Sequence, residues 1–353
     1  MENNTDRKYF DMVKYIKQNG REKSDRTGTG TISLFDYNIS FDMSEGFPLI
    51  TSKKMHYNGI IHELVWFLKG DTNIKYLVDN GVNIWNGDVY KFYLNNIKDK
   101  TPLSDKEFIE MIKTDEDFCD MWGDLGPVYG QQWRDAGGWT ELVLSKKKDH
   151  NGFFQFVKKR HKGIDQITNL VNQLTNNPDS RRMVVDAWNV KYLPDMKLPP
   201  CHFAFQCYTY VMTESERIEE WCKSLVKDIS YGEDMTHEDL NKSNFPTRKL
   251  DLKSIIRSND IFLGCPYNIA SYALLTHLLA NEVNMIPGKL SITIGDAHIY
   301  LNHLEACEKQ LNQKTYKLPN VSISKKSIFD IEFDDIKILN YKSSPRIKGE
   351  LSN

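Results

Sequence analysis

The stretch Lys197-Leu198-Pro199-Pro200-Cys201-His202 continues directly into Phe203-Ala204-Phe205-Gln206-Cys207-Tyr208-Thr209-Tyr210-Val211. Each proline fixes its own φ angle and restricts the residue before it. The alternation that follows has the period of two that is typical of a β-strand. We therefore expect Cys201 in a stiff turn at the start of a strand.

Cys201 has two interpretations on local grounds. Free cysteine is among the most buried residue types, so an ordinary core cysteine is the simpler one. The alternative is a nucleophile, which attacks only as a thiolate and so needs positive charge or a hydrogen-bond donor nearby. His202 is not expected to supply that charge, because successive residues of a strand point to opposite sides.

The composition is that of a globular protein. Of 353 residues, 40% are hydrophobic and 27% charged, and the net charge is -2, which does not indicate a general nucleic-acid binder. The six cysteines are too sparse for a disulfide scaffold and lack zinc-ligand spacing, so no metal site is expected. Because no apolar signal region or membrane-length stretch occurs, we expect a cytoplasmic protein without membrane contact.

Upstream of Cys201, the sequence predicts two helices and a loop rich in glycine and threonine. The apolar spacing predicts helices over residues 7–19 and 59–69. Glu63 lies in the second helix among apolar neighbours, either turned to solvent or buried as a general acid or base. Between these helices the Gly/Thr-rich residues 24–31 form either a hairpin turn or a loop that holds a phosphate, and a strand is expected to follow.

Three charged stretches read as insertions into one α+β domain that covers residues 1–353. They span about 86–121, which is helical in pattern, 135–162, and 213–249. The second is rich in Lys, His and Gly. A basic face for nucleic acid is one interpretation of it, and a solvated loop is the favoured one.

Strands and helices are expected to alternate through the rest of the chain. A helix is predicted from residue 164 to 176, followed by a strand over 182–188. Arg181 and Arg182 can serve one site only at the end of that strand, or if one of them faces another subunit. Further strands are predicted at 250–256, at 290–294 and beyond 322, with an apolar helix to about 280 and another helix opened by residues 295–303. The fold class is thus α+β, with helices packed on a mixed sheet.

Ten short motifs occur along the chain between Asp25 and about Lys348, outside the insertions. They are Asp25-Arg26-Thr27-Gly28-Thr29-Gly30, Phe47-Pro48-Leu49, His62-Glu63, Gly70-Asp71-Thr72-Asn73, Gly123-Asp124-Leu125-Gly126-Pro127-Val128-Tyr129-Gly130, Asp179-Ser180-Arg181-Arg182, Pro200-Cys201-His202, Arg257-Ser258, Asn268-Ile269-Ala270-Ser271-Tyr272 and Asp296-Ala297-His298-Ile299-Tyr300. In this order they resemble the motifs of the thymidylate synthase family, which includes pyrimidine hydroxymethylases.

The resemblance implies a methyltransferase of dTMP biosynthesis, with dUMP as substrate and 5,10-methylenetetrahydrofolate as co-substrate. Cys201 would add to C6 of the pyrimidine, and Asn268 would read the pyrimidine edge. Glu63 would relay protons, helped by Tyr129 and His202. The phosphate would be held by Arg26, Arg181, Arg182, Arg257 and Ser258, the sugar by His298 and Tyr300, and the folate by Lys53, Trp85 and Asp260.

The resemblance also implies a homodimer, because Arg181 and Arg182 would come from the partner subunit. Three positions depart from the family pattern. Ile256 stands where Gln is usual, Asn86 stands where Asp is usual, and the chain ends in the polar Leu351-Ser352-Asn353. Poor closure over the folate would favour an alternative product, 5-hydroxymethyl-dUMP made without hydride transfer. A nucleic-acid-binding or regulatory module with the same fold is the third interpretation.

Overall fold

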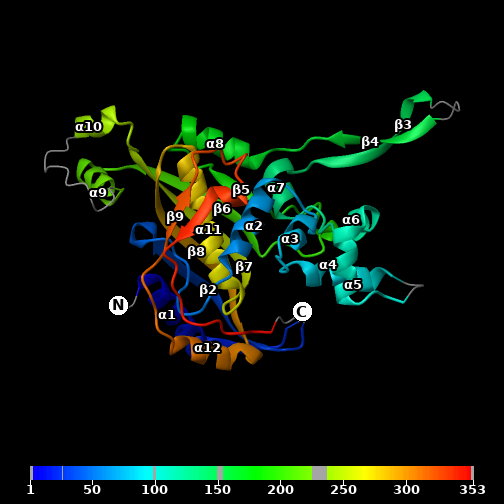
Figure 1. The fold of residues 1–353 in the computed structure, drawn as a ribbon, viewed down its shortest axis with the longest axis horizontal. Coiled ribbons are helices and arrows are strands. Elements are labelled where there is room, and N and C mark those ends of the chain that lie inside the picture. The colour runs from blue at the N-terminus through cyan, green and yellow to red at the C-terminus, as the bar shows by residue number, and fades with distance from the viewer. Residues whose placement is uncertain (1–2, 26, 98–100, 149–153, 225–236, 351–353) are drawn as a thin grey trace. The chain divides into compact units, whose positions relative to one another are not determined.

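The computed structural model describes residues 3–25, 27–97, 101–148, 154–224 and 237–350 (Figure 1). The chain forms two compact units. Unit 1 comprises residues 1–64, 171–184 and 204–353, and unit 2 comprises residues 65–170 and 185–203. The prediction of one catalytic domain with three insertions stays a prediction. No helix among the described residues is long and apolar enough to cross a membrane.

A six-stranded mixed sheet is the main element of unit 1. Its strand order is β1-β2-β8-β7-β6-β5. Strand β2 pairs antiparallel with β8, whereas β7 pairs parallel with β8. The strands are β1 (Arg21–Lys23), β2 (Thr31–Asp42), β5 (Val184–Asp186), β6 (His202–Val211), β7 (Arg248–Asp260) and β8 (Ile286–Tyr300). The predicted α+β fold with a mixed sheet is confirmed.

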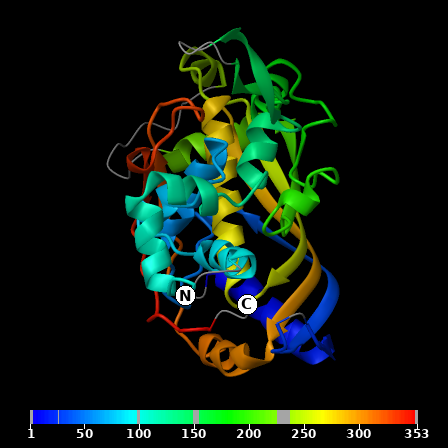
Figure 2. The ribbon, with the colours of Figure 1, turned by 90° about the vertical axis from the view of Figure 1, so that its right-hand side faces the viewer.

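One face of the sheet is buried under helices. Helix α11 (Gly264–Glu282) packs on β7 and β8, and α1 (Asn4–Asn19) packs on β2 and β8 (Figures 1 and 2). The residues below them alternate as the sequence pattern predicts: Ile39, Phe41, Phe205, Cys207, Leu252, Ile256, Leu290, Ile292 and Ile294 are all buried. On the opposite face Tyr208 is exposed and Tyr210 is half-buried.

The prediction for residues 295–303 was wrong. Instead of opening a helix, residues 295–300 continue β8, because each side of that strand has a neighbour, with Asp296 opposite both Phe35 and Ser258. The chain leaves the sheet only at a 3₁₀ turn, Leu301–His303, before α12 (Leu304–Leu311). The tail then forms a small sheet of β9 (Asn320–Ile323) and β10 (Ile336–Leu339).

Unit 2 is mostly helical. Its helices are α3 (Lys75–Asp79), α4 (Asn86–Asn96), α5 (Asp105–Thr114), α6 (Glu116–Trp122) and α7 (Tyr129–Asp135). Helices α4 to α6 form the predicted helical segment, and an aromatic cluster of Tyr93, Phe108, Phe118 and Trp122 holds them together. Helices α2 (Tyr57–Leu68) and α8 (Gln166–Asn176) carry the chain between the units.

The remaining two predicted insertions differ in structure. The stretch 135–162 was predicted as a loop, but its described residues include β3 (Trp139–Lys148) and β4 (Phe154–His161), which pair antiparallel. Residues 213–249 contain α9 (Glu214–Ser224) and α10 (His237–Lys242). The buried Arg217 joins these helices by donating to Asn241 Oδ1 and to the carbonyls of Phe245 and Pro246.

Candidate functional site

Cys201 lies in unit 2, in a bend just before β6, and it is half-buried. Its backbone N–H donates to the hydroxyl oxygen of Tyr129, with 2.7 Å between the heavy atoms. Tyr129 is the first residue of α7 and is buried. The Pro-Pro turn is also anchored upstream, where the N–H of Lys197 donates to the carbonyl of Leu125 at 2.9 Å. The thiol therefore sits on a fixed segment of backbone, as the prolines predict.

His202 stacks on Tyr129, with ring centroids 4.2 Å apart and planes tilted by 24°. The Phe67 ring lies 6.0 Å from the same imidazole. Loss of solvation lowers the pKa of His202 to about 3. The imidazole is therefore neutral at pH 7, so it is no source of the positive charge that an activated thiol needs.

Trp85 comes just before α4 and is buried in the same unit. The centroid of its ring lies 5.9 Å from the centroid of the Tyr129 ring and 6.4 Å from that of the Trp66 ring. Cys201, His202, Tyr129 and Trp85 are thus gathered around one aromatic cluster. The sequence pattern missed the contribution of Phe67, although its place on the apolar face of α2 is the signal that could have shown it.

The Gly/Thr-rich loop of unit 1 is the turn of a hairpin between β1 and β2, which pair antiparallel. The Asp25 carboxylate closes the turn by accepting from the N–H groups of Thr27 at 2.9 Å and Gly30 at 2.8 Å. A hydrogen bond from the Thr27 hydroxyl, more than any other cause, lowers the pKa of Asp25. Gly28 and Gly30 adopt φ angles of 76° and 80°, which favour glycine. The hairpin interpretation is confirmed, and Arg26 lies outside the described residues.

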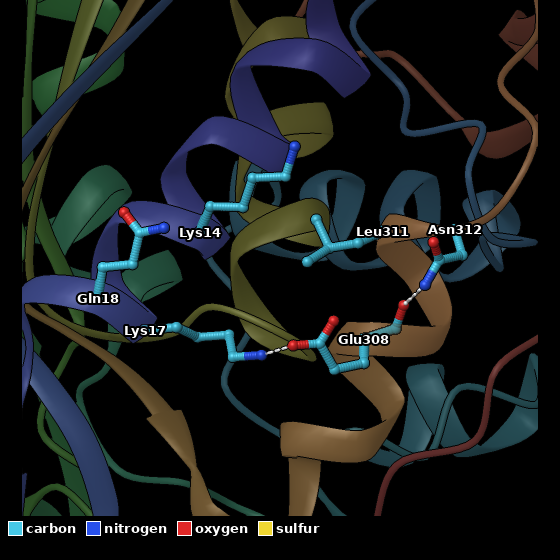
Figure 3. Close-up of a pocket in the computed structure, with 6 residues that line it drawn as sticks. All are labelled: Lys14, Lys17, Gln18, Glu308, Leu311 and Asn312. Carbon is cyan, nitrogen blue, oxygen red and sulfur yellow. Dashed lines mark hydrogen bonds and ion pairs between the residues drawn. The ribbon is translucent and has the colours of Figure 1, made fainter.

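The loop also borders a hollow of about 450 Å³, lined by Glu22, Lys23, Ser24, Gly28, Thr29, Gly30 and Leu301. A second hollow in unit 1, of about 570 Å³, lies between α1 and α12 and contains none of the predicted site residues (Figure 3). There the ammonium of Lys17 forms an ion pair with the Glu308 carboxylate.

The ends of β7 and β8 bring several predicted residues together. The parallel register places Ser258 beside Asp296 and Asp260 beside His298. Arg257, Ser258, His298 and Tyr300 are all half-buried. The rings of His298 and Tyr300 meet edge to face, with centroids 5.2 Å apart.

Asp296 is a member of this cluster that the sequence pattern missed. Its carboxylate lies 3.3 Å from His298 Nδ1, 2.8 Å from Ser33 Oγ and 3.0 Å from Lys23 Nζ. The hydrogen bond to His298 is the main reason why the pKa of Asp296 is held well below its usual range. The spacing of Asp296, His298 and Tyr300 has the period of a strand, and this is the signal that could have shown that their side chains share one face of β8.

Asn268 and Glu63 lie on helices of unit 1. Asn268 is in the second turn of α11 and donates from Nδ2 to Oδ1 of Asn259, at 3.3 Å. Glu63 is half-buried on α2. Burial is the largest cause that raises the pKa of the Tyr272 hydroxyl, and the nearby Glu63 carboxylate raises it further.

Lys53 and Asp260 meet at the start of α11. The Lys53 side chain is buried, its ammonium donates to the carbonyl of Phe262, and Nζ lies 3.8 Å from the centre of the Phe262 ring. Burial lowers the pKa of Lys53 to about 8. Asp260 Oδ1 accepts from the N–H groups of Phe262 and Leu263, and Oδ2 lies 3.7 Å from His303 Nδ1.

Arg181 and Arg182 precede β5 and are exposed. The strand begins at Val184, two residues later than predicted, so the arginines are not consecutive residues of a strand. The N–H of Arg182 donates to Ser180 Oγ at 3.2 Å, which fixes the backbone of this turn. Both guanidinium groups are therefore presented outward from a fixed turn.

Comparison with known proteins gives a consistent result over the whole chain. The family model described as thymidylate synthase matches residues 7–353. A thymidylate synthase of Mesoplasma florum is 42% identical over 350 residues, covering 98% of this chain and 99% of the relative. The thymidylate synthases of Mycoplasma pneumoniae and Mycoplasma genitalium are 41% and 39% identical over 349 and 350 residues, with the same coverage.

Proposed function

The chain belongs to the thymidylate synthase family, and we propose that it converts dUMP into dTMP. The one-carbon unit and the hydride both come from 5,10-methylenetetrahydrofolate, which leaves as dihydrofolate. The observation that carries this function is the match over nearly the full length of relatives that are named thymidylate synthase. Those names do not favour the hydroxymethylase alternative.

Cys201 is proposed as the nucleophile. Addition of its thiolate to C6 of dUMP turns C5 into an enolate-like carbon that can attack the one-carbon unit. A half-buried thiol on an anchored turn supports this role, because the attacking atom needs a fixed position. Neutral His202 then acts as a hydrogen-bonding group rather than as a cation.

Glu63, Tyr129 and Asn268 are proposed to handle protons and hydrogen bonds at the pyrimidine. Half-burial of Glu63 supports a proton-relay role, since a carboxyl group needs both a restricted environment and access to water. Asn268 presents one donor and one acceptor to O4 and N3–H of uracil. The hydroxyl oxygen of Tyr129 accepts the backbone N–H of Cys201 and so fixes the position of that backbone.

The phosphate dianion of dUMP is proposed to bind to arginines and a hydroxyl. Arg257 and Ser258 at the end of β7 lie in the same unit as the Gly/Thr-rich loop, and guanidinium groups suit phosphate geometry. His298 and Tyr300 of β8 are proposed to bind the sugar hydroxyl. The Asp296 carboxylate at His298 Nδ1 supports this, because it leaves Nε2 to face the ligand. Arg26 is proposed to join the phosphate ligands.

Asp260, Trp85 and Lys53 are proposed to bind the folate. The residues fit such a group in chemistry: among the described residues only Oδ1 of Asp260 accepts backbone hydrogen bonds, which leaves Oδ2 for an N–H donor of a pterin. Trp85 belongs to an aromatic cluster of the kind that packs on flat rings. Lys53 donates to the Phe262 carbonyl, so its contact with a glutamate tail requires its ammonium to leave that carbonyl.

The protein is further proposed to act as a homodimer in the cytoplasm. The sheet face opposite α11 carries the exposed Tyr208 and the half-buried Tyr210 and Ile255, and an apolar sheet face of this kind favours a second copy as its cover. Exposed Arg181 and Arg182 then complete the partner's phosphate site.

The test is turnover of dUMP with methylenetetrahydrofolate, followed by the absorbance of dihydrofolate and by product analysis. We expect dTMP and dihydrofolate in equal amounts. Cys201→Ser should bind dUMP but lose at least about 10⁴-fold in kcat, whereas the exposed Cys222→Ser on α9 should keep its activity. Loss of dUMP without dihydrofolate would favour the hydroxymethylase, and an inactive parent protein would favour a binding module.

A further inference from the structure

Asn259 is a buried polar residue to which the proposed reaction gives no role. It lies on β7, between Ser258 and Asp260, and only 3% of its surface is exposed. Its Oδ1 accepts from Nδ2 of Asn268 at 3.3 Å. Among the described residues, its own buried Nδ2 has no hydrogen-bond partner. A buried amide nitrogen without a hydrogen-bond partner destabilises the fold, so its presence calls for an explanation.

The reading of a pyrimidine by an asparagine has a built-in ambiguity. Uracil presents an acceptor at O4 and a donor at N3, whereas cytosine presents a donor at N4 and an acceptor at N3. An amide matches uracil in one orientation, and after a half-turn about its last torsion it matches cytosine equally well. Asn268 alone would therefore not separate the two bases.

The contact with Asn259 removes this ambiguity. Because Oδ1 of Asn259 can only accept a hydrogen bond, it favours the nitrogen of the Asn268 amide, and not the oxygen, on its own side. Asn268 then keeps its second N–H and its Oδ1 in one orientation. The half-turned amide would place two oxygens against each other and would lose this hydrogen bond.

The orientation of Asn259 is itself supported by helix α11. Its Oδ1 faces Gly264, the first residue of that helix, where a Cβ would lie 3.1 Å from the oxygen. The N-terminus of a helix carries partial positive charge, which favours the amide oxygen there over the amide nitrogen. The residue before the helix, Leu263, makes no side-chain capping hydrogen bond.

We propose that Asn259 is a specificity-determining residue, which positions the Asn268 amide so that the site takes a uracil and rejects a cytosine nucleotide. The inference rests on the proposed function of Asn268 at the pyrimidine edge. Asn259 acts through Asn268, and its unpartnered Nδ2 is available to a water molecule or to the bound nucleotide.

The test compares Asn259→Ala with Asn259→Asp, because aspartate keeps the acceptor that faces Asn268. The dissociation constants of dUMP and dCMP are measured by calorimetry, and kcat/KM is measured for dUMP. Asn259→Ala should reduce the preference for dUMP over dCMP by about 10-fold or more, the worth of one hydrogen bond to a buried group. Asn259→Asp should restore most of the preference.

Two further results separate the failure modes. An unchanged preference in Asn259→Ala, with a changed one in Asn268→Ala, would overturn the positioning role and leave the proposed function intact. An unchanged preference in Asn268→Ala as well would overturn the role of Asn268. If Asn259→Ala does not fold, Asn259→Leu takes its place, because leucine is similar in size and lacks the acceptor: a reduced preference supports the inference, and an unchanged preference overturns it.

Discussion

The Tyr129 hydroxyl shows how one atom can link the fold to the chemistry. It accepts the backbone N–H of Cys201, and its ring stacks on His202 and lies near Trp85. This hydrogen bond fixes the backbone of Cys201, the proposed nucleophile, just before β6. The residue therefore holds the thiol in place whether or not it contacts the substrate.

We predict that Tyr129→Phe lowers kcat by about 10-fold, because loss of one hydrogen bond of about 1 kcal/mol lets the Cys201 turn move. The matched control is Tyr93→Phe. Tyr93 is equally buried in unit 2, and its hydroxyl accepts the backbone N–H of Leu103 at 3.1 Å.

Both variants should lose a similar free energy of unfolding, measured by urea titration, but only Tyr129→Phe should lose turnover. Equal activity of the two variants would show that the Tyr129 hydroxyl serves stability alone.

At the scale of elements, the 3₁₀ turn after β8 places one histidine between two distant segments. His303 is fully buried, with Nε2 at 2.8 Å from the carbonyl oxygen of Glu350 and Nδ1 at 3.7 Å from Asp260. Nearby, a Cβ at Gly349 would lie 2.7 Å from the Phe262 ring, so the end of the chain fits closely there. The turn thus connects the C-terminal segment to the Asp260 end of β7.

The stabilisation that His303 gives to the C-terminal segment should depend on pH. Burial lowers the pKa of His303, but the Asp260 carboxylate and the Glu350 carbonyl together raise it more, so the pKa lies above its usual value despite the opposing charge of Lys53. Cys307 and Cys265 are protonated thiols, with pKa values raised to about 12 by burial. The charged imidazole gains a donor toward Asp260. This stabilisation is full below about pH 6.5, the unfolded pKa, and is lost as the pH rises through the folded pKa.

Hydrogen exchange of residues near Gly349 is measured in the wild type and in His303→Gln at pH 5.5 and at pH 8.5. The ratio of the two rates at one pH cancels the intrinsic rate of exchange. The wild type should exchange more slowly than the variant by a larger factor at pH 5.5 than at pH 8.5. His277→Gln is the matched control, since burial lowers the pKa of His277 to about 4 and it stays neutral over this range. A ratio that does not change with pH would contradict the role of His303.

The elements show what sequence patterns can and cannot reveal. Periodicity predicted α8 and β6 to within a few residues, because each has one buried face. It also predicted the end of α11 near residue 280, although that helix is buried nearly all round. It failed for residues 295–300, where a strand with neighbours on both sides carries Asp296, His298 and Tyr300 on its other face. It also gave no sign that Arg217, in the charged stretch 213–249, is buried, because its acceptors near residues 241–246 are distant in sequence.

For the candidate site, motifs predicted residues but not the contacts that those residues make. The buried position of Lys53 and the ligands of Asp296 depend on tertiary packing, which no spacing encodes. The pair of Asn259 and Asn268 was missed for the same reason: a strand end and a helix meet there in space.

At the scale of the whole molecule, the open sheet face and the exposed arginines lead to one prediction about the dimer. Each proposed active site takes Cys201 and Arg257 from one subunit and Arg181 and Arg182 from the other. Cys201→Ser and the double variant Arg181→Ala/Arg182→Ala should each be inactive alone, because every site lacks one part.

After the two inactive variants are unfolded together and refolded in equal amounts, half of the dimers should be mixed, and each mixed dimer should have one intact site. About one quarter of the wild-type activity should return, as expected for twofold symmetry. The matched control mixes Cys201→Ser with Arg257→Ala. Both changes then affect parts from the same subunit, so no mixed dimer has an intact site and activity should stay absent. Gel filtration of the wild-type protein checks the premise: a monomer would contradict the dimer itself, whereas a dimer without recovery in the first mixture would contradict only the sharing of arginines.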